Sequence, residues 1–111
     1  MRTAMQGVYL EFYLQEGCRH HGILAYEWLL QQARTLGIPG GTALRAIAGY
    51  GRRGQMHEGH FFELAGDLPV VVGFALAPQE AQRLLDHVAG EQLALFYVRT
   101  PVEMGVTGAS T

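Results

Sequence analysis

The sequence GVYLEFYLQ, residues 7–15, alternates two kinds of position and decides how the rest of the chain has to be arranged. One set consists of Val8, Leu10, Phe12 and Leu14, and the other contains Tyr9, Glu11 and Tyr13. This period of two predicts a β-strand. Because both sets carry bulky apolar or aromatic groups, we expect helices to cover one face of the sheet and another subunit to cover the other.

Beyond this strand, the spacing of apolar residues predicts two helices and three more strands. A loop over residues 16–21 leads to a helix with an apolar stripe, which stops at Gly37. The second helix starts at Pro78, a residue suited to the first helical turn, and ends at Gly90. The predicted strands cover residues 42–49, 70–76 with an earlier piece at 61–64, and 92–98, and Thr100-Pro101 closes the last of them.

The resulting order βαββαβ predicts an α+β fold with ferredoxin-like topology. Two interleaved right-handed βαβ crossovers give a four-stranded antiparallel sheet with both helices on one face. The other face is then bare in a single chain, with Tyr9 and Tyr13 on it, so we expect the sheets to associate into a closed oligomer. We expect one domain over residues 1–111, with a core over 6–100 and a tail over 101–111.

The composition excludes several classes of function. The chain has 111 residues, of which 49% are hydrophobic and 16% charged, enough apolar surface for a folded domain. It carries eight arginines, no lysine and a net charge of -2, so we expect no nucleic-acid partner, no Walker A loop and no Schiff-base lysine. A lone Cys18, and the lack of an apolar run of about 20 residues, indicate a cytoplasmic protein.

The segment GYGRRG, residues 49–54, opens a long loop that runs to Gly59. Glycines offer backbone N–H groups without an obstructing Cβ, and the two adjacent arginines offer guanidiniums that grip phosphate oxygens. Long loops in compact domains are uncommon unless they are functional or mobile. The local sequence therefore fits an anion cradle, and a flexible turn with solvated arginines fits it equally well.

Three motifs spread along the chain carry a family resemblance. They are LGIPGGT at residues 36–42, LRAIAGYG at 44–51 followed by Arg52 and His57, and DLPVVV at 67–72. Together they resemble a PII-like family of conserved bacterial and archaeal proteins, numbered one hundred and ninety among domains of unknown function. The similarity extends from Val8 to about Arg99. More distantly, GYGR at residues 49–52 resembles the opening of the long loop in PII signal-transduction proteins, and Leu68-Pro69 resembles its end.

The resemblance implies a non-catalytic signalling protein that works as a homotrimer. In such a trimer the three sheets face inward, and an adenine nucleotide is held in each cleft between neighbouring subunits. Residues 50–60 would form a mobile loop that changes shape with the bound ligand and docks on a partner, often a membrane transporter.

The same resemblance implies which residues contact the nucleotide. Gly49 and Gly51 would present their backbone to the phosphates, Arg52 would pair with them, and Arg99 would contribute a second guanidinium. We place Tyr50 in the same site, together with Arg45, which lies on the less apolar face of its strand.

Two departures from the PII pattern narrow the choice of ligand. PII proteins carry a glutamine after the loop arginine that helps to hold magnesium and 2-oxoglutarate, whereas this chain has Arg53. The loop that wraps the phosphates before the last strand of PII proteins is reduced here to residues 89–91. We therefore expect AMP, ADP or a cyclic nucleotide, and no sensing of 2-oxoglutarate.

Metal binding and catalysis are the competing interpretations. Candidate metal ligands are Cys18, His20 and His21 in one loop, and His57 and His60 three residues apart. Because neither spacing completes a tetrahedral site, we assign no metal ligands. A divalent-metal-binding trimer of the cation-tolerance type, which shares the ferredoxin-like architecture, is the alternative function. We expect no enzyme activity, since Cys18 lacks an oxyanion cradle and the sequence offers no carboxylate pair.

Overall fold

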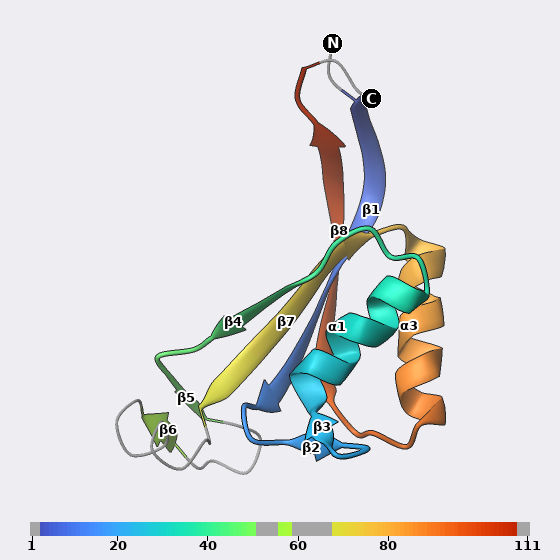
Figure 1. The fold of residues 1–111 in the computed structure, drawn as a ribbon. Helices are drawn as coiled ribbons and strands as arrows, with labels where there is room; N and C mark the ends of the chain where they lie inside the picture. The colour runs from blue at the N-terminus through green and yellow to red at the C-terminus, as the bar shows by residue number, and fades with distance from the viewer. Residues whose placement is uncertain (1–2, 51–55, 59–67, 109–111) are drawn as a thin grey trace.

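The computed structural model describes residues 3–50, 56–58 and 68–108. Its elements are, in chain order, β1 (Thr3–Gln15), β2 (Arg19–His20), β3 (Ile23–Leu24), α1 (Ala25–Thr35), β4 (Thr42–Arg45), β5 (Ala48–Tyr50), β6 (Met56–Glu58), β7 (Pro69–Leu76), α3 (Pro78–Gly90) and β8 (Phe96–Val106). Figure 1 shows α1 and α3 side by side on one face of a sheet. Neither α1 nor α3 is long and apolar enough to cross a membrane.

The main sheet has four strands in the order β4-β7-β1-β8. All neighbouring strands in it are antiparallel. The first strand thus lies between β7 and the last strand, which is the interleaving of two βαβ units that defines the ferredoxin-like fold. The predicted α+β fold is therefore confirmed, with both helices on the same face (Figure 1).

The core lies between this sheet and the two helices. The even-numbered residues of β1 from Val8 to Leu14 point into it, and Leu10 and Phe12 are fully buried there. The Phe12 ring meets Phe74 of β7 edge to face, with ring centroids 6.3 Å apart. Leu29 of α1 and Leu84 of α3 close the core from the helix side. Burying a leucine or phenylalanine side chain stabilises a fold by about 1.5–3 kcal/mol, so this layer holds the domain together.

Both helices end where local chemistry favours it. Gly37 has a φ of 83°, a left-handed conformation that suits glycine, and its N–H bonds the carbonyl of Arg34 at the end of α1. At the start of α3, the Glu80 carboxylate accepts a hydrogen bond of 2.8 Å from the Ala77 N–H, and Pro78 takes the first helical position. The predicted ends of the second helix, at Pro78 and Gly90, are confirmed.

The last strand differs from its prediction. It was expected over residues 92–98 and closed by Thr100-Pro101, but β8 starts at Phe96 and continues to Val106. Pro101 is tolerated because β8 is an edge strand, where a missing N–H breaks no ladder on the open side. Residues 101–106 are therefore a paired strand and not a tail. They form, with the start of β1, an arm that projects beyond the helices (Figure 1).

The structure subdivides one segment that was predicted as a single strand and two that were predicted as loops. The strand predicted over residues 42–49 breaks after Arg45, where the Ala46 N–H bonds the Pro69 carbonyl at 2.8 Å, and resumes as β5. β5 pairs with β6, so part of the predicted loop over 49–59 is a two-stranded ribbon. The predicted loop over 16–21 contains β2, which pairs with β3. The strand piece predicted at 61–64 lies outside the described residues.

Candidate functional site

The predicted nucleotide loop begins in β5, beside the start of β7. Gly49 pairs with His57 and Tyr50 with Met56, and the Tyr50 side chain is 71% exposed. Gly51 and Arg52 lie outside the described residues, so the roles assigned to them stay predictions. β5 and β6 therefore fix the root of this loop and turn the Tyr50 side chain away from the core.

Among the residues that the structure describes, nothing requires a glycine at position 49. Its φ lies outside the left-handed region, and a Cβ built on it would meet Pro69 Cγ at 3.6 Å, an ordinary van der Waals contact. By contrast, a Cβ on Gly41 would lie 2.5 Å from a ring carbon of Phe74, so packing explains that glycine. Position 49 thus carries no side chain although the described residues leave room for a methyl group.

The two other arginines assigned to the nucleotide site, Arg45 and Arg99, lie on opposite edges of the sheet. Arg45 ends β4 and forms an ion pair with the Glu16 carboxylate. Arg99 lies in β8, where it donates to the side-chain oxygen of Gln82 at 3.1 Å and to the Pro78 carbonyl at 3.4 Å. Because β4 and β8 are the two outer strands, one chain does not bring Arg45 and Arg99 together.

The sheet face away from the helices carries a continuous apolar row. Strand register aligns Leu44 of β4, Val71 of β7, Tyr13 of β1 and Phe96 of β8 across all four strands. Leu44 is 63% exposed and Phe96 49%, and the rings of Tyr13 and Phe96 lie 5.6 Å apart. Tyr9 lies on the same face over Gly73, where a Cβ would come within 2.2 Å of its hydroxyl oxygen. None of the described elements of the chain covers this face, as the sequence predicted.

Tyr13 also carries a polar group on this face. Its hydroxyl donates a hydrogen bond of 3.2 Å to the Glu11 carboxylate. Partial burial, followed by the hydrogen bond to Glu11 and the negative charge of that carboxylate, raises the pKa of Tyr13 above its ordinary value. The phenol is therefore neutral at physiological pH and presents a ring, with no charge of its own, to whatever covers the face.

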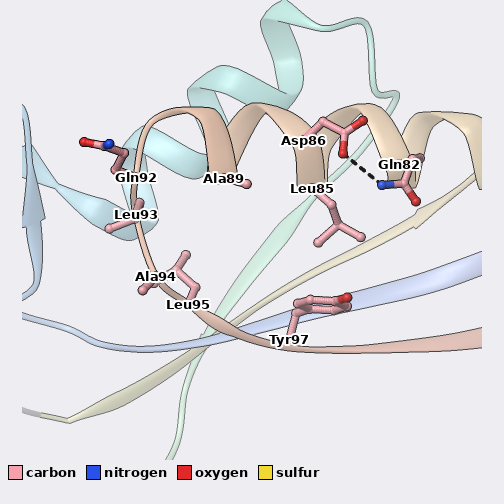
Figure 2. A pocket seen from close by; sticks show the side chains of 9 residues that line it. All are labelled: Gln82, Leu85, Asp86, Ala89, Gln92, Leu93, Ala94, Leu95 and Tyr97. Atoms are coloured by element: carbon pink, nitrogen blue, oxygen red, sulfur yellow. Dashed lines mark hydrogen bonds between the residues drawn. The ribbon is translucent and has the colours of Figure 1, made fainter.

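A groove of about 510 Å³ lies between α3, residues 92–95 and the start of β8. Figure 2 shows Leu85 pointing from α3 toward the Tyr97 ring, with Gln82 and Asp86 along the helix above them. Gln82 donates a hydrogen bond of 2.9 Å to Asp86 and also accepts one from Arg99. The groove therefore has an apolar floor and a polar rim, and it sits at the same sheet edge as Arg99.

A comparison with known families identifies the chain. The family model of domain of unknown function 190, described as uncharacterized ACR, matches residues 7–104. The chain belongs to this family. A relative, the UPF0166 protein of Aquifex aeolicus, is 33% identical over 86 residues, which cover 78% of this chain and 82% of the relative. The resemblance found in the sequence motifs is confirmed.

The chain is also similar to solved structures of PII-like proteins. One is CPII of Thiomonas intermedia K12, a nitrogen regulatory PII-like protein bound to ADP, AMP and bicarbonate, with a TM-score of 0.63 and 23% identity. Another is CPII bound to ADP and bicarbonate, with a TM-score of 0.61 and 21% identity. Each match covers 94% of this chain and 91% of the CPII chain. At these identities the likeness establishes a PII-like fold.

Two features of the structure were not predicted from the sequence. They are the groove beside α3 and a cluster of two histidines and a glutamate at the end of α3. The groove depends on the path of residues 92–95 under α3, which alternation alone misassigned to a strand. The cluster joins His20 and His21 to Glu91, about 70 residues away in the sequence. Hydrogen bonds from His21 and then His20 lower the pKa of the Glu91 carboxyl. Of the other histidine pair, His57 lies in β6 and His60 lies outside the described residues.

Proposed function

We propose that this protein is a PII-like regulator that binds an adenine nucleotide, AMP, ADP or a cyclic nucleotide, between copies of its own chain. We further propose that it is cytoplasmic, does not catalyse a reaction, and contacts a partner, of which a membrane transporter is one class, through residues 50–60. The observation that carries the proposal is Gly49, a glycine at the root of the glycine-arginine loop that neither its φ nor the packing of the described residues requires.

The chemistry of phosphate recognition supports this interpretation of Gly49. Backbone N–H groups that are free of side chains, next to arginines, are a common way to hold phosphate oxygens. Residues 49–53 supply both within five positions. CPII, which shares the fold, is bound to ADP and AMP, and this supports an adenine nucleotide as the ligand class.

The arrangement of the edges supports a site between chains. Arg45 and the start of the loop lie at the β4 edge, whereas Arg99 and the groove under α3 lie at the β8 edge. We propose that copies meet through their open sheet faces around a closed ring in which the β4 edge of one chain lies near the β8 edge of the next. We propose a homotrimer as that ring, which also buries the exposed row from Leu44 to Phe96.

Calorimetric titration with AMP, ADP, ATP and cyclic AMP tests the proposal directly. At about 100 μM protein, a dissociation constant of about 10 μM gives measurable heat. We expect Arg52→Ala to weaken binding by about 10- to 150-fold, the equivalent of one hydrogen bond to a charged group. Arg34→Ala, which removes an exposed guanidinium from α1, is the matched control and should leave affinity unchanged. No heat with any nucleotide would exclude the proposal.

A separate measurement tests the proposed lack of catalysis. Wild-type protein incubated with the nucleotide that it binds should leave it intact, as followed by chromatography over hours. Turnover that disappears in Arg52→Ala would make the protein an enzyme.

A further inference from the structure

We propose that His20, His21 and Glu91 form a binding site for a transition-metal dication of the zinc type. The three side chains come from two separate segments, the β2–β3 turn and the residue that follows α3. One donor atom from each lies within 4.8 Å of the others. The site uses none of the residues assigned to the nucleotide, so it stands or falls independently of the proposed function.

The geometry converges on one carboxylate oxygen. The Nε2 atoms of His20 and His21 lie 3.1 and 2.7 Å from Glu91 Oε1. In a tetrahedral site with metal–ligand bonds near 2.0–2.1 Å, neighbouring donors are separated by roughly 3.3 Å. The two histidine nitrogens therefore need to move away from Glu91 Oε1 by roughly 0.2 and 0.6 Å to admit the ion.

The turn that carries the histidines presents both of them to Glu91. His21 and Gly22 have φ values of 53° and 81°, and His20 pairs with Ile23 across the turn. Two central residues with positive φ define a type I′ hairpin, which most often contains Asn-Gly. The turn is further tied by a hydrogen bond of 3.0 Å from the Arg19 guanidinium to the Gly22 carbonyl. An imidazole thus occupies a tip position that asparagine would fill equally well.

Aromatic packing holds one ligand in place. The His20 side chain is 14% exposed, and its ring meets Trp28 edge to face with centroids 4.6 Å apart. Trp28 in turn stacks on His87, whose Nε2 lies 2.7 Å from the side-chain oxygen of Gln32. Side chains that hold a metal ligand in position raise metal affinity, because the ligand side chain is already ordered before the metal binds.

Exposure and charge suit entry of a cation from solvent. His21 is 66% and Glu91 33% exposed, so the ion reaches the site without a change of fold, and the fourth position faces water. Two neutral imidazoles and one carboxylate are a recognised zinc ligand set with an open position. Imidazole selects zinc, cobalt, nickel and copper over magnesium and calcium, which prefer oxygen.

The test uses the full chain without a histidine tag and without nucleotide. Titration with Zn²⁺ and Co²⁺ should give one ion per chain, and bound Co²⁺ should show tetrahedral absorption bands, whereas Mg²⁺ should give no signal. His21→Asn keeps the turn and removes one ligand, and Glu91→Gln keeps the side-chain shape. Each should lower affinity at least tenfold, since even supporting residues cost 10- to 100-fold.

Two controls separate this site from general binding. Glu27→Gln removes an exposed carboxylate from α1, and His57→Asn removes an imidazole of the other histidine pair. Both variants should bind zinc like the wild type. The proposal is overturned if wild-type protein binds no zinc at 100 μM, or if His21→Asn and Glu91→Gln bind it unchanged. Nucleotide binding measured on the same variants reports on the other proposal alone.

Discussion

Replacing Gly49 by alanine separates the stability of the fold from its proposed ligand site. The added methyl group would lie 3.6 Å from Pro69 Cγ, and the backbone at this position does not need glycine. Alanine also restricts the unfolded chain, so the free energy of unfolding should stay constant or rise by about 0.4–1 kcal/mol. In contrast, a methyl that holds a phosphate away from the Gly49 N–H should cost about 1.5–3 kcal/mol of binding, or roughly 10- to 150-fold in affinity.

Two measurements on each of three proteins decide this prediction. Urea unfolding gives stability and calorimetry gives the dissociation constant for ADP, for wild type, Gly49→Ala and Gly40→Ala. Gly40 is a matched control, because a Cβ there has no atom within 4 Å and its φ is outside the left-handed region. It should change neither affinity nor fold. Wild-type affinity in a folded Gly49→Ala protein would refute the reasoning.

Three other predictions concern the open sheet face, the glycine before β4 and the core. Leu44→Asp should dissociate the proposed trimer, as measured by light scattering, without unfolding the chain, because it places a carboxylate on a 63% exposed position of the open face, whereas Gln31→Asp on the outside of α1 should not. Gly41→Ala should lower the unfolding free energy by about 1–3 kcal/mol, since Phe74 is buried and cannot give way, and an unchanged urea midpoint would contradict this. Leu84→Ala should cost about 2–5 kcal/mol in the same assay, and a smaller loss would mean that the core collapses around the gap.

The elements with strong local signals were predictable from the sequence. The alternation through residues 7–15 located most of β1 and both of its faces, although the strand begins earlier, at Thr3, and Pro78 and Gly90 marked the ends of α3. These signals depend on neighbours in the chain, so composition and period suffice to detect them. The ferredoxin-like order followed because few topologies join such elements without crossing connections.

The features that were missed depend on contacts distant in sequence. Pro101 looked like the end of a strand, but its place at the outer edge opposite Val8 allows β8 to continue. Glu91 gave no local sign that it meets His20 and His21, because only the packing of the β2–β3 turn against the end of α3 brings them together. The loop residues that would complete the nucleotide site lie partly outside the described chain, so that site remains a prediction.

Native mass spectrometry of the wild-type protein with ADP tests the central claim most directly, because it counts chains and nucleotides in one particle. A regulator with its sites between copies should appear as three chains carrying up to three ADP molecules, with no ADP on any single chain. A single chain that binds ADP by itself, or a trimer that binds none, would contradict the account.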